Sequence, residues 1–161
     1  MNFRIYQNSF KLGHLTKYLT IINPLKQQVT EISPKGSVHY VHVLDRSYSM
    51  CDVLEDLIKN VKQTIAMMED GDFLSIIWFS GSGQYSTLIK GATKKDNLDA
   101  LLDSISSPIG STCFSEPLQE CNKIIDELRL LCPRFVITLF TDGYPCVQWS
   151  YEASRIKKQF V

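Results

Sequence analysis

The sequence has no excess of charge of either sign. Seventeen Lys and Arg residues balance seventeen Asp and Glu residues among 161 positions, and the longest basic stretches, residues 94–95 and 155–158, are short. A protein that binds nucleic acid normally gathers basic residues on one surface, so this composition argues against a nucleic-acid partner. With 44% hydrophobic residues, the chain also has too much apolar side chain for a disordered protein.

Long apolar runs are missing as well. The first ten residues contain no apolar stretch of signal-peptide length, and no segment approaches the roughly 20 apolar residues of a membrane-spanning helix. We therefore expect a cytoplasmic protein with no membrane partner.

The cysteines have no C-x-x-C spacing, which argues against a zinc knuckle or a disulfide framework and favours reduced, mostly buried thiols. They are Cys51, Cys113, Cys121, Cys132 and Cys146.

Two regions of the sequence have different hydrophobic patterns. Residues 1–35 contain short alternating apolar and polar runs, which predict a small N-terminal appendage of two or three β-strands. Residues 36–161 alternate apolar strand patterns with amphipathic helix patterns, as in an α/β fold. We expect a Rossmann-like domain, that is, a doubly wound, mostly parallel sheet with helices on both faces. The expected strands are 38–44, 73–79, 85–89 and 135–140, and the expected helices are 53–68, 98–105, 114–128 and 152–161.

Oxygen-bearing side chains follow the expected strands and precede the long helix. Asp45, Ser47 and Ser49 come after the first buried strand, Thr112 lies in the loop that enters the helix 114–128, and Asp142 follows the strand 135–140. Because sites in such sheets lie at the carboxyl ends of the strands, these side chains should meet at one edge. Carboxylates and hydroxyls are ligands for Mg²⁺, with Mn²⁺ and Ca²⁺ as alternatives, and this set would leave part of the coordination shell open.

These motifs together resemble the metal-ion-dependent adhesion site (MIDAS) of the von Willebrand factor type A (vWA) domain. The pattern Asp45-x-Ser47-x-Ser49 is followed by Gly-Ser-Thr112 and then by Thr-Asp142-Gly, each in the expected structural context. The resemblance covers about residue 36 to the C-terminus. The N-terminal strand pattern resembles, more loosely, that of bacterial stand-alone members.

The resemblance implies a role for each of these five side chains. Ser47, Ser49 and Thr112 would bind Mg²⁺ directly, and Asp45 and Asp142 would bind it directly or through water. An Asp or Glu of a protein partner would complete the coordination. The implied function is a metal-ion-dependent protein–protein interaction module, with no enzymatic activity.

The sequence departs from the family pattern at the rim of this site and at its C-terminal end. Arg46 and Tyr48 stand where many relatives have smaller residues; with Gly143 and Tyr144 they should flank the opening and contact the partner. The family has two more strands and a helix after the position of Asp142. We therefore expect a shortened domain in which strand 135–140 lies at a sheet edge and pairs with a partner or a second copy.

Two alternative functions are compatible with parts of the pattern. An Mg²⁺-dependent phosphohydrolase could use Asp45 as its nucleophile, although Ser47 stands where such a site would want a second carboxylate. The other alternative function is a metal-free scaffold subunit of an ATP-driven assembly.

The three histidines, His14, His39 and His42, are expected to pack in or near strands. His39 and His42 should lie on opposite faces of one strand, because they are three residues apart.

Overall fold

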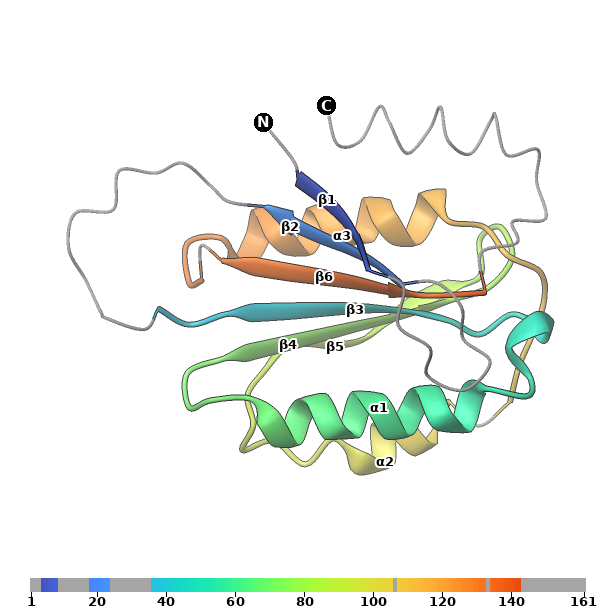
Figure 1. The fold of residues 1–161 in the computed structure, drawn as a ribbon, viewed down its shortest axis with the longest axis horizontal. Helices are drawn as coiled ribbons and strands as arrows, with labels where there is room; N and C mark the ends of the chain where they lie inside the picture. Colours follow the sequence, from blue (N-terminus) through green and yellow to red (C-terminus); the bar gives the residue numbers. More distant parts are fainter. Residues whose placement is uncertain (1–3, 9–17, 24–35, 106, 133, 143–161) are drawn as a thin grey trace.

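A six-stranded sheet forms the centre of the described part of the chain (Figure 1). The computed structural model describes residues 4–8, 18–23, 36–105, 107–132 and 134–142. The strands are β1 (Arg4–Asn8), β2 (Tyr18–Asn23), β3 (His39–Asp45), β4 (Phe73–Phe79), β5 (Tyr85–Ala92) and β6 (Phe135–Phe140). The helices are the 3₁₀ turn η1 (Tyr48–Met50), α1 (Leu54–Met67), α2 (Asp99–Asp103) and α3 (Ser115–Leu128). The expected helix 152–161 lies outside the described residues.

The sheet is mixed, with the strand order β1-β2-β6-β3-β4-β5. The three central strands β6, β3 and β4 run parallel, whereas β5 pairs antiparallel with β4 as a hairpin partner. On the other side, β2 is antiparallel to β6 and β1 is antiparallel to β2. The α/β fold is therefore as predicted, but the parallel arrangement is confined to the three central strands.

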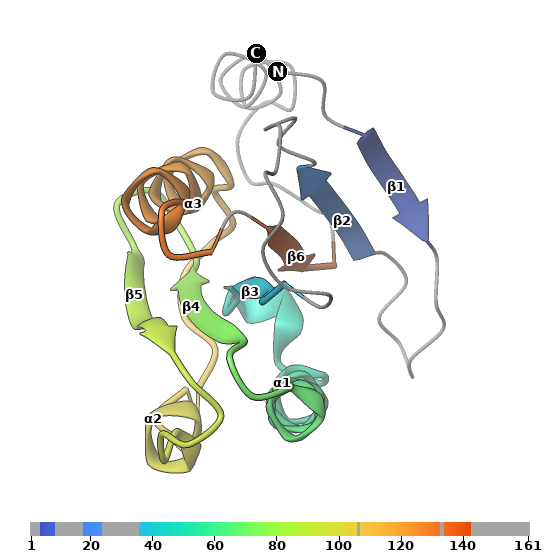
Figure 2. The same ribbon diagram turned by 90° about the vertical axis from the view of Figure 1, so that its left-hand side faces the viewer.

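Helices cover both faces of the sheet, α1 and α2 on one face and α3 on the other (Figures 1 and 2). The side chains of β3 and β4 divide between two buried clusters, because successive residues of a strand point to opposite faces. Leu44, Leu74 and Ile76 pack with residues of α1 and α2. Val41, Val43, Ile77 and Phe79 pack with Leu118, Cys121 and Ile124 of α3. These two cores hold the carboxyl ends of β3 and β4 in fixed positions.

The N-terminal strands belong to the same sheet as the rest of the domain. Strand β2 pairs with β6 along its whole length, from Tyr18 opposite Phe140 to Asn23 opposite Phe135. The expectation that strand 135–140 lies at a sheet edge is therefore wrong, because the chain's own β2 pairs with its backbone. Self-association through that strand loses its basis. Within the described residues, the two edges of this sheet are β1 and β5.

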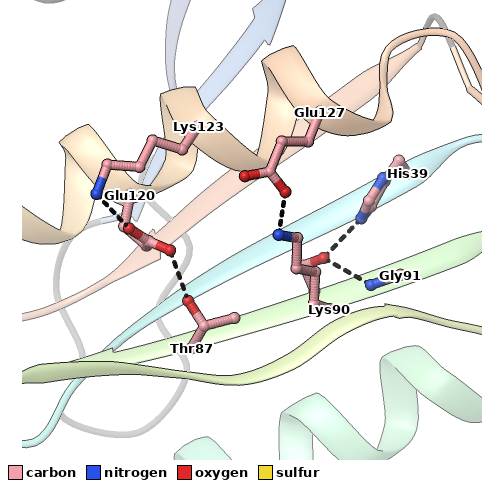
Figure 3. Close-up of polar contacts among 8 residues, drawn as sticks. His39, Thr87, Lys90, Gly91, Glu120, Lys123 and Glu127 are labelled. Atoms are coloured by element: carbon pink, nitrogen blue, oxygen red, sulfur yellow. Dashed lines mark hydrogen bonds and ion pairs between the residues drawn. The ribbon is translucent and has the colours of Figure 1, made fainter.

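Polar side chains join the edge strand β5 to helix α3 (Figure 3). The hydroxyl of Thr87 donates to Glu120 at 3.1 Å, and the other carboxylate oxygen of Glu120 accepts from Lys123 at 3.0 Å. About two helical turns after Glu120, Glu127 forms an ion pair with Lys90. These contacts connect α3 to the sheet outside the apolar core.

The histidines of β3 pack within the sheet, as predicted. His39 Nε2 lies 2.8 Å from Ser75 Oγ, and its ring stacks on Phe135 on the α3 face. His42 meets the edge of Phe140, which belongs to the core on the α1 face. Burial lowers the pKa of both imidazoles to about 4. His14 lies outside the described residues.

The described cysteines are free thiols. Cys113, Cys121 and Cys132 are buried, and burial raises the pKa of Cys121, which keeps it protonated. Cys51 is exposed, so the expectation of burial is wrong there; Cys146 lies outside the described residues.

In the part of the chain that the structure describes, no helix is long and apolar enough to cross a bilayer.

Candidate functional site

Asp45 joins the loop after β3 to the loop after β6. It is the last residue of β3 and is completely buried. Its Oδ1 accepts a hydrogen bond from the backbone N–H of Ser47 at 2.9 Å, and its Oδ2 accepts one from the hydroxyl of Thr141 at 2.6 Å. A carboxylate oxygen has more than one lone pair, so each oxygen keeps the capacity to bind a further group.

The turn after Asp45 brings two serine hydroxyls together. Ser47 precedes η1 and is buried, whereas Ser49 lies within the turn and is exposed. Their Oγ atoms are 3.0 Å apart. The turn is closed by a hydrogen bond from the N–H of Met50 to the carbonyl of Ser47, and the Met50 side chain is buried in the core on the α1 face. This anchor fixes the two hydroxyls beside the buried carboxylate.

Thr112 lies in a loop that is bonded to the ends of both β3 and β4. The N–H of Ile109 donates to the carbonyl of Arg46 at 2.7 Å, and the N–H of Tyr48 donates to the carbonyl of Gly110 at 3.2 Å. Just after Thr112, the N–H of Cys113 donates to the carbonyl of Ser80 at 2.8 Å. Thr112 is itself buried. The loop therefore reaches the same edge of the sheet as Asp45.

Gly110 is the one position in this loop where a side chain would not fit. Its φ of 64° is in the left-handed region, and an added Cβ would collide with the side-chain oxygen of Gln84. That oxygen accepts a hydrogen bond from the buried hydroxyl of Ser80 at 2.9 Å. The hydrogen-bonded side chains of Gln84 and Ser80 thus pack against Gly110 and support the loop that carries Thr112.

Asp142 contributes a second carboxylate at this edge. It follows Thr141, the donor to Asp45, and is half-buried. Burial raises the pKa of the Asp45 carboxyl above its usual value, and the charge of Asp142 raises it further, while the hydrogen bonds from Ser47 and Thr141 act in the opposite direction. Burial is the largest of these effects on Asp45, and the charge of Asp142 is a smaller one in the same direction.

The structure thus brings the segments that carry the five predicted metal ligands to one edge of the sheet. Hydrogen bonds connect Asp45, Ser47 and Ser49. The loop of Thr112 is bonded to the backbone of Arg46 and Tyr48, and Thr141, which precedes Asp142, is bonded to Asp45 itself. Of the predicted rim, Tyr48 is 68% exposed and Arg46 is half-buried. Gly143 and Tyr144 lie outside the described residues.

The donor set of this edge fits a hard divalent cation such as Mg²⁺. Two carboxylates and three hydroxyls supply only oxygen atoms, and the carboxylate charge is partly buried. Among the described residues, no group of three or more His, Cys, Asp or Glu side chains is arranged to hold a metal. The candidate site has only two such side chains, Asp45 and Asp142, and its other three oxygen donors are hydroxyls, so it differs from a group of that kind.

The sequence interpretation missed three supporting residues. Thr141 donates to Asp45, and Ser80 and Gln84 support the loop of Thr112. The role of Thr141 could have been predicted from the sequence, since a hydroxyl residue stands directly before Asp142 at the end of a strand. The pairing of Ser80 with Gln84 depends on the shape of the turn after β4 and had no such signal.

Comparison with known proteins gives a likeness in fold. No family model and no curated protein matches this chain. Among solved structures, it is similar to the pilus adhesin SpaC of Lactobacillus rhamnosus GG in its open conformation, with a TM-score of 0.50 and 19% identity. The match covers 78% of this chain and 16% of the adhesin chain. At this identity, the likeness supports an α/β fold and nothing about the site.

Proposed function

We propose that this chain is a metal-ion-dependent protein-interaction module of the vWA type. Mg²⁺, or Mn²⁺ or Ca²⁺ in its place, would be held by Asp45, Ser47, Ser49, Thr112 and Asp142. A partner protein would supply an Asp or Glu side chain. The observation that carries the proposal is the buried Asp45 carboxylate, which accepts hydrogen bonds from both the serine turn and the loop of Asp142.

The charges at the site support a bound cation. A buried carboxylate such as that of Asp45 is unfavourable in the absence of positive charge. Within the described residues, no Lys, Arg or His forms an ion pair with Asp45. When bound, the cation would offset the charge of Asp45 and would present a positive centre to an acidic side chain of the partner.

The position of the site in the fold supports the same proposal. In a doubly wound, Rossmann-like sheet, ligands bind at the carboxyl ends of the parallel strands. The three parallel strands and the helices on both faces are compatible with that description, and Asp45 and Asp142 follow two of these strands.

The surroundings of Asp45 favour binding over phosphoryl transfer. A nucleophilic carboxylate has to present an oxygen to a bulky phosphoryl group, whereas Asp45 is completely buried. A metal ion is small and needs only the lone pairs that the two hydrogen-bonded oxygens keep. We therefore propose that Asp45 holds the site together. If the protein hydrolysed p-nitrophenyl phosphate and Asp45→Asn abolished that turnover, the phosphohydrolase would replace this proposal.

Isothermal titration with Mg²⁺ tests the proposed metal site. We expect the wild type to bind one Mg²⁺ and Asp142→Asn to bind it at least tenfold more weakly, because a ligand charge is lost. Asp70→Asn is the matched control, since Asp70 is exposed in the turn before β4, at the opposite end of that strand. Equal Mg²⁺ affinity in all three proteins, or no binding by the wild type, would contradict the proposal.

A further inference from the structure

Arg46 is held in a fixed position at the rim of the candidate site. Its Nε donates a hydrogen bond to the carbonyl of Ser107 at 2.5 Å, and its guanidinium carbon lies 5.2 Å from the centre of the Trp78 ring. Its backbone carbonyl accepts from Ile109, so both ends of the residue are held. A guanidinium that is immobilised before a ligand arrives loses less conformational entropy on binding.

The charge of Arg46 is not neutralised by an acidic side chain of the described part of the chain. The cations that form ion pairs there are Lys62, Lys90, Lys123 and Arg129. Since Nε of Arg46 is used by Ser107, the donors on its two terminal nitrogens remain for a ligand. A planar pair of N–H donors matches the two oxygens of a carboxylate.

We propose that Arg46 is a second anchor for the partner and binds a second carboxylate near the one at the metal. This inference rests on the proposed function. Arg46 directly follows Asp45, and both its side chain and its backbone carbonyl are bonded to the loop that carries Thr112, so the two anchors lie at the same edge of the sheet. The partner is therefore an acidic segment that carries two carboxylates one to three residues apart.

Short peptides with one or two carboxylates test this inference. The probes are acetylated, amidated peptides with Glu-Glu, Glu-Gly-Glu or Glu-Gly-Gly-Glu centres, each compared with the same peptide in which the second Glu is Gln. Affinities come from ¹⁵N NMR titration at saturating Mg²⁺. For at least one spacing, we expect the wild type to bind the two-Glu peptide about fivefold to tenfold more tightly than the one-Glu peptide.

Two variants and one control separate the roles of Arg46. In Arg46→Gln, the preference for the two-Glu peptide should fall to a purely statistical one, which arises because either of its two Glu side chains can bind the metal. Arg46→Lys keeps the charge but loses the planar fork, so its preference should be intermediate. Lys59→Gln removes a positive charge from the exposed face of α1 and should behave as the wild type.

The outcomes distinguish this inference from the proposed function. An unchanged preference in Arg46→Gln would overturn the second anchor. An equal loss of affinity for both peptides, together with weaker Mg²⁺ binding, would show that Arg46 only holds the loop of Ser107 and Ile109, and would also overturn it. Absence of Mg²⁺ binding in the wild type would instead refute the proposed function, and the inference with it.

Discussion

Replacing His42 by Leu removes a buried imidazole that has no hydrogen-bond partner among the described residues. The side chain is 3% exposed, and neither ring nitrogen is hydrogen-bonded within the part of the chain that the structure describes. Loss of contact with water lowers the pKa of this imidazole from 6.5 to about 4. The folded protein therefore keeps His42 neutral in a pH range where the unfolded chain protonates it.

The size of the effect follows from the two pKa values of His42. As the pH falls below 6.5, the unfolded state takes up a proton that the folded state takes up only near pH 4. Unfolding then binds a proton, so the free energy of unfolding decreases as the pH falls and is unaffected above that window. The loss amounts to about 2 kcal/mol at pH 5 and about 3 kcal/mol at pH 4, at about 1.4 kcal/mol per pKa unit.

Urea unfolding of the wild type and His42→Leu at pH 7, 6 and 5 measures this difference. His39 and the carboxylates titrate in both proteins, so their contributions cancel in the comparison. We expect the stability of the variant relative to the wild type to increase by about 2 kcal/mol between pH 7 and pH 5. Parallel stability curves for the two proteins would refute the reasoning that burial holds His42 neutral.

Three further substitutions test the structure of the candidate site. Asp45→Asn should bind Mg²⁺ at least tenfold more weakly, yet in EDTA its free energy of unfolding should lie within about 1 kcal/mol of the wild type, because a buried charge is removed; a much larger loss would contradict the balance described for this carboxylate. Gly110→Ala should lower the free energy of unfolding by about 1–2 kcal/mol, and Gln84→Ala should relieve only the steric part of that loss, since the positive φ remains; full relief would show that φ costs nothing there. Thr141→Val should lower the free energy of unfolding in EDTA by about 1–2 kcal/mol, because the hydrogen bond to the carboxylate is lost; equal urea midpoints would show that this bond does not contribute.

Two of the three central strands, β4 and β6, could be predicted to the residue, whereas β3 was predicted over 38–44 and spans His39–Asp45. Residues 73–79 and 135–140 are short apolar runs with a turn or Pro before them, and the structure has strands with those bounds. A strand with both faces buried has to be apolar along its whole length, so its ends are visible in the sequence. Strand β5 extends beyond the predicted 85–89 to Ala92, through an irregular pairing with β4 near Ser75 and Gly91.

The partner of a strand is not encoded in its own pattern. Alternation in residues 1–35 indicates strands, but the choice of β6 as the neighbour of β2 is a long-range backbone pairing. The prediction of an edge position for strand 135–140 rested on the further strands that the vWA family has after the position of Asp142. Nothing in the pattern of residues 1–35 indicated β6 as a neighbour, so that segment was predicted as an appendage. Only the three-dimensional pairing shows that the two belong to one sheet.

The candidate site divides in the same way between local and long-range features. Asp45, Ser47 and Ser49 lie within five residues, so their meeting at a strand end follows from the local sequence. The position of Thr112 depends on hydrogen bonds from its loop to the ends of β3 and β4, which no local pattern encodes. The support from Gln84 depends on such packing as well.

The most direct test of the central claim is the position of a paramagnetic Mn²⁺ ion on the ¹⁵N-labelled protein. Substoichiometric Mn²⁺ should broaden the amide signals of Ser47, Ser49, Thr112 and Asp142 first, and an excess of Mg²⁺ should restore them. Broadening confined to other acidic surfaces, or broadening at the site that Mg²⁺ does not reverse, would contradict a metal centre at the carboxyl ends of β3 and β6.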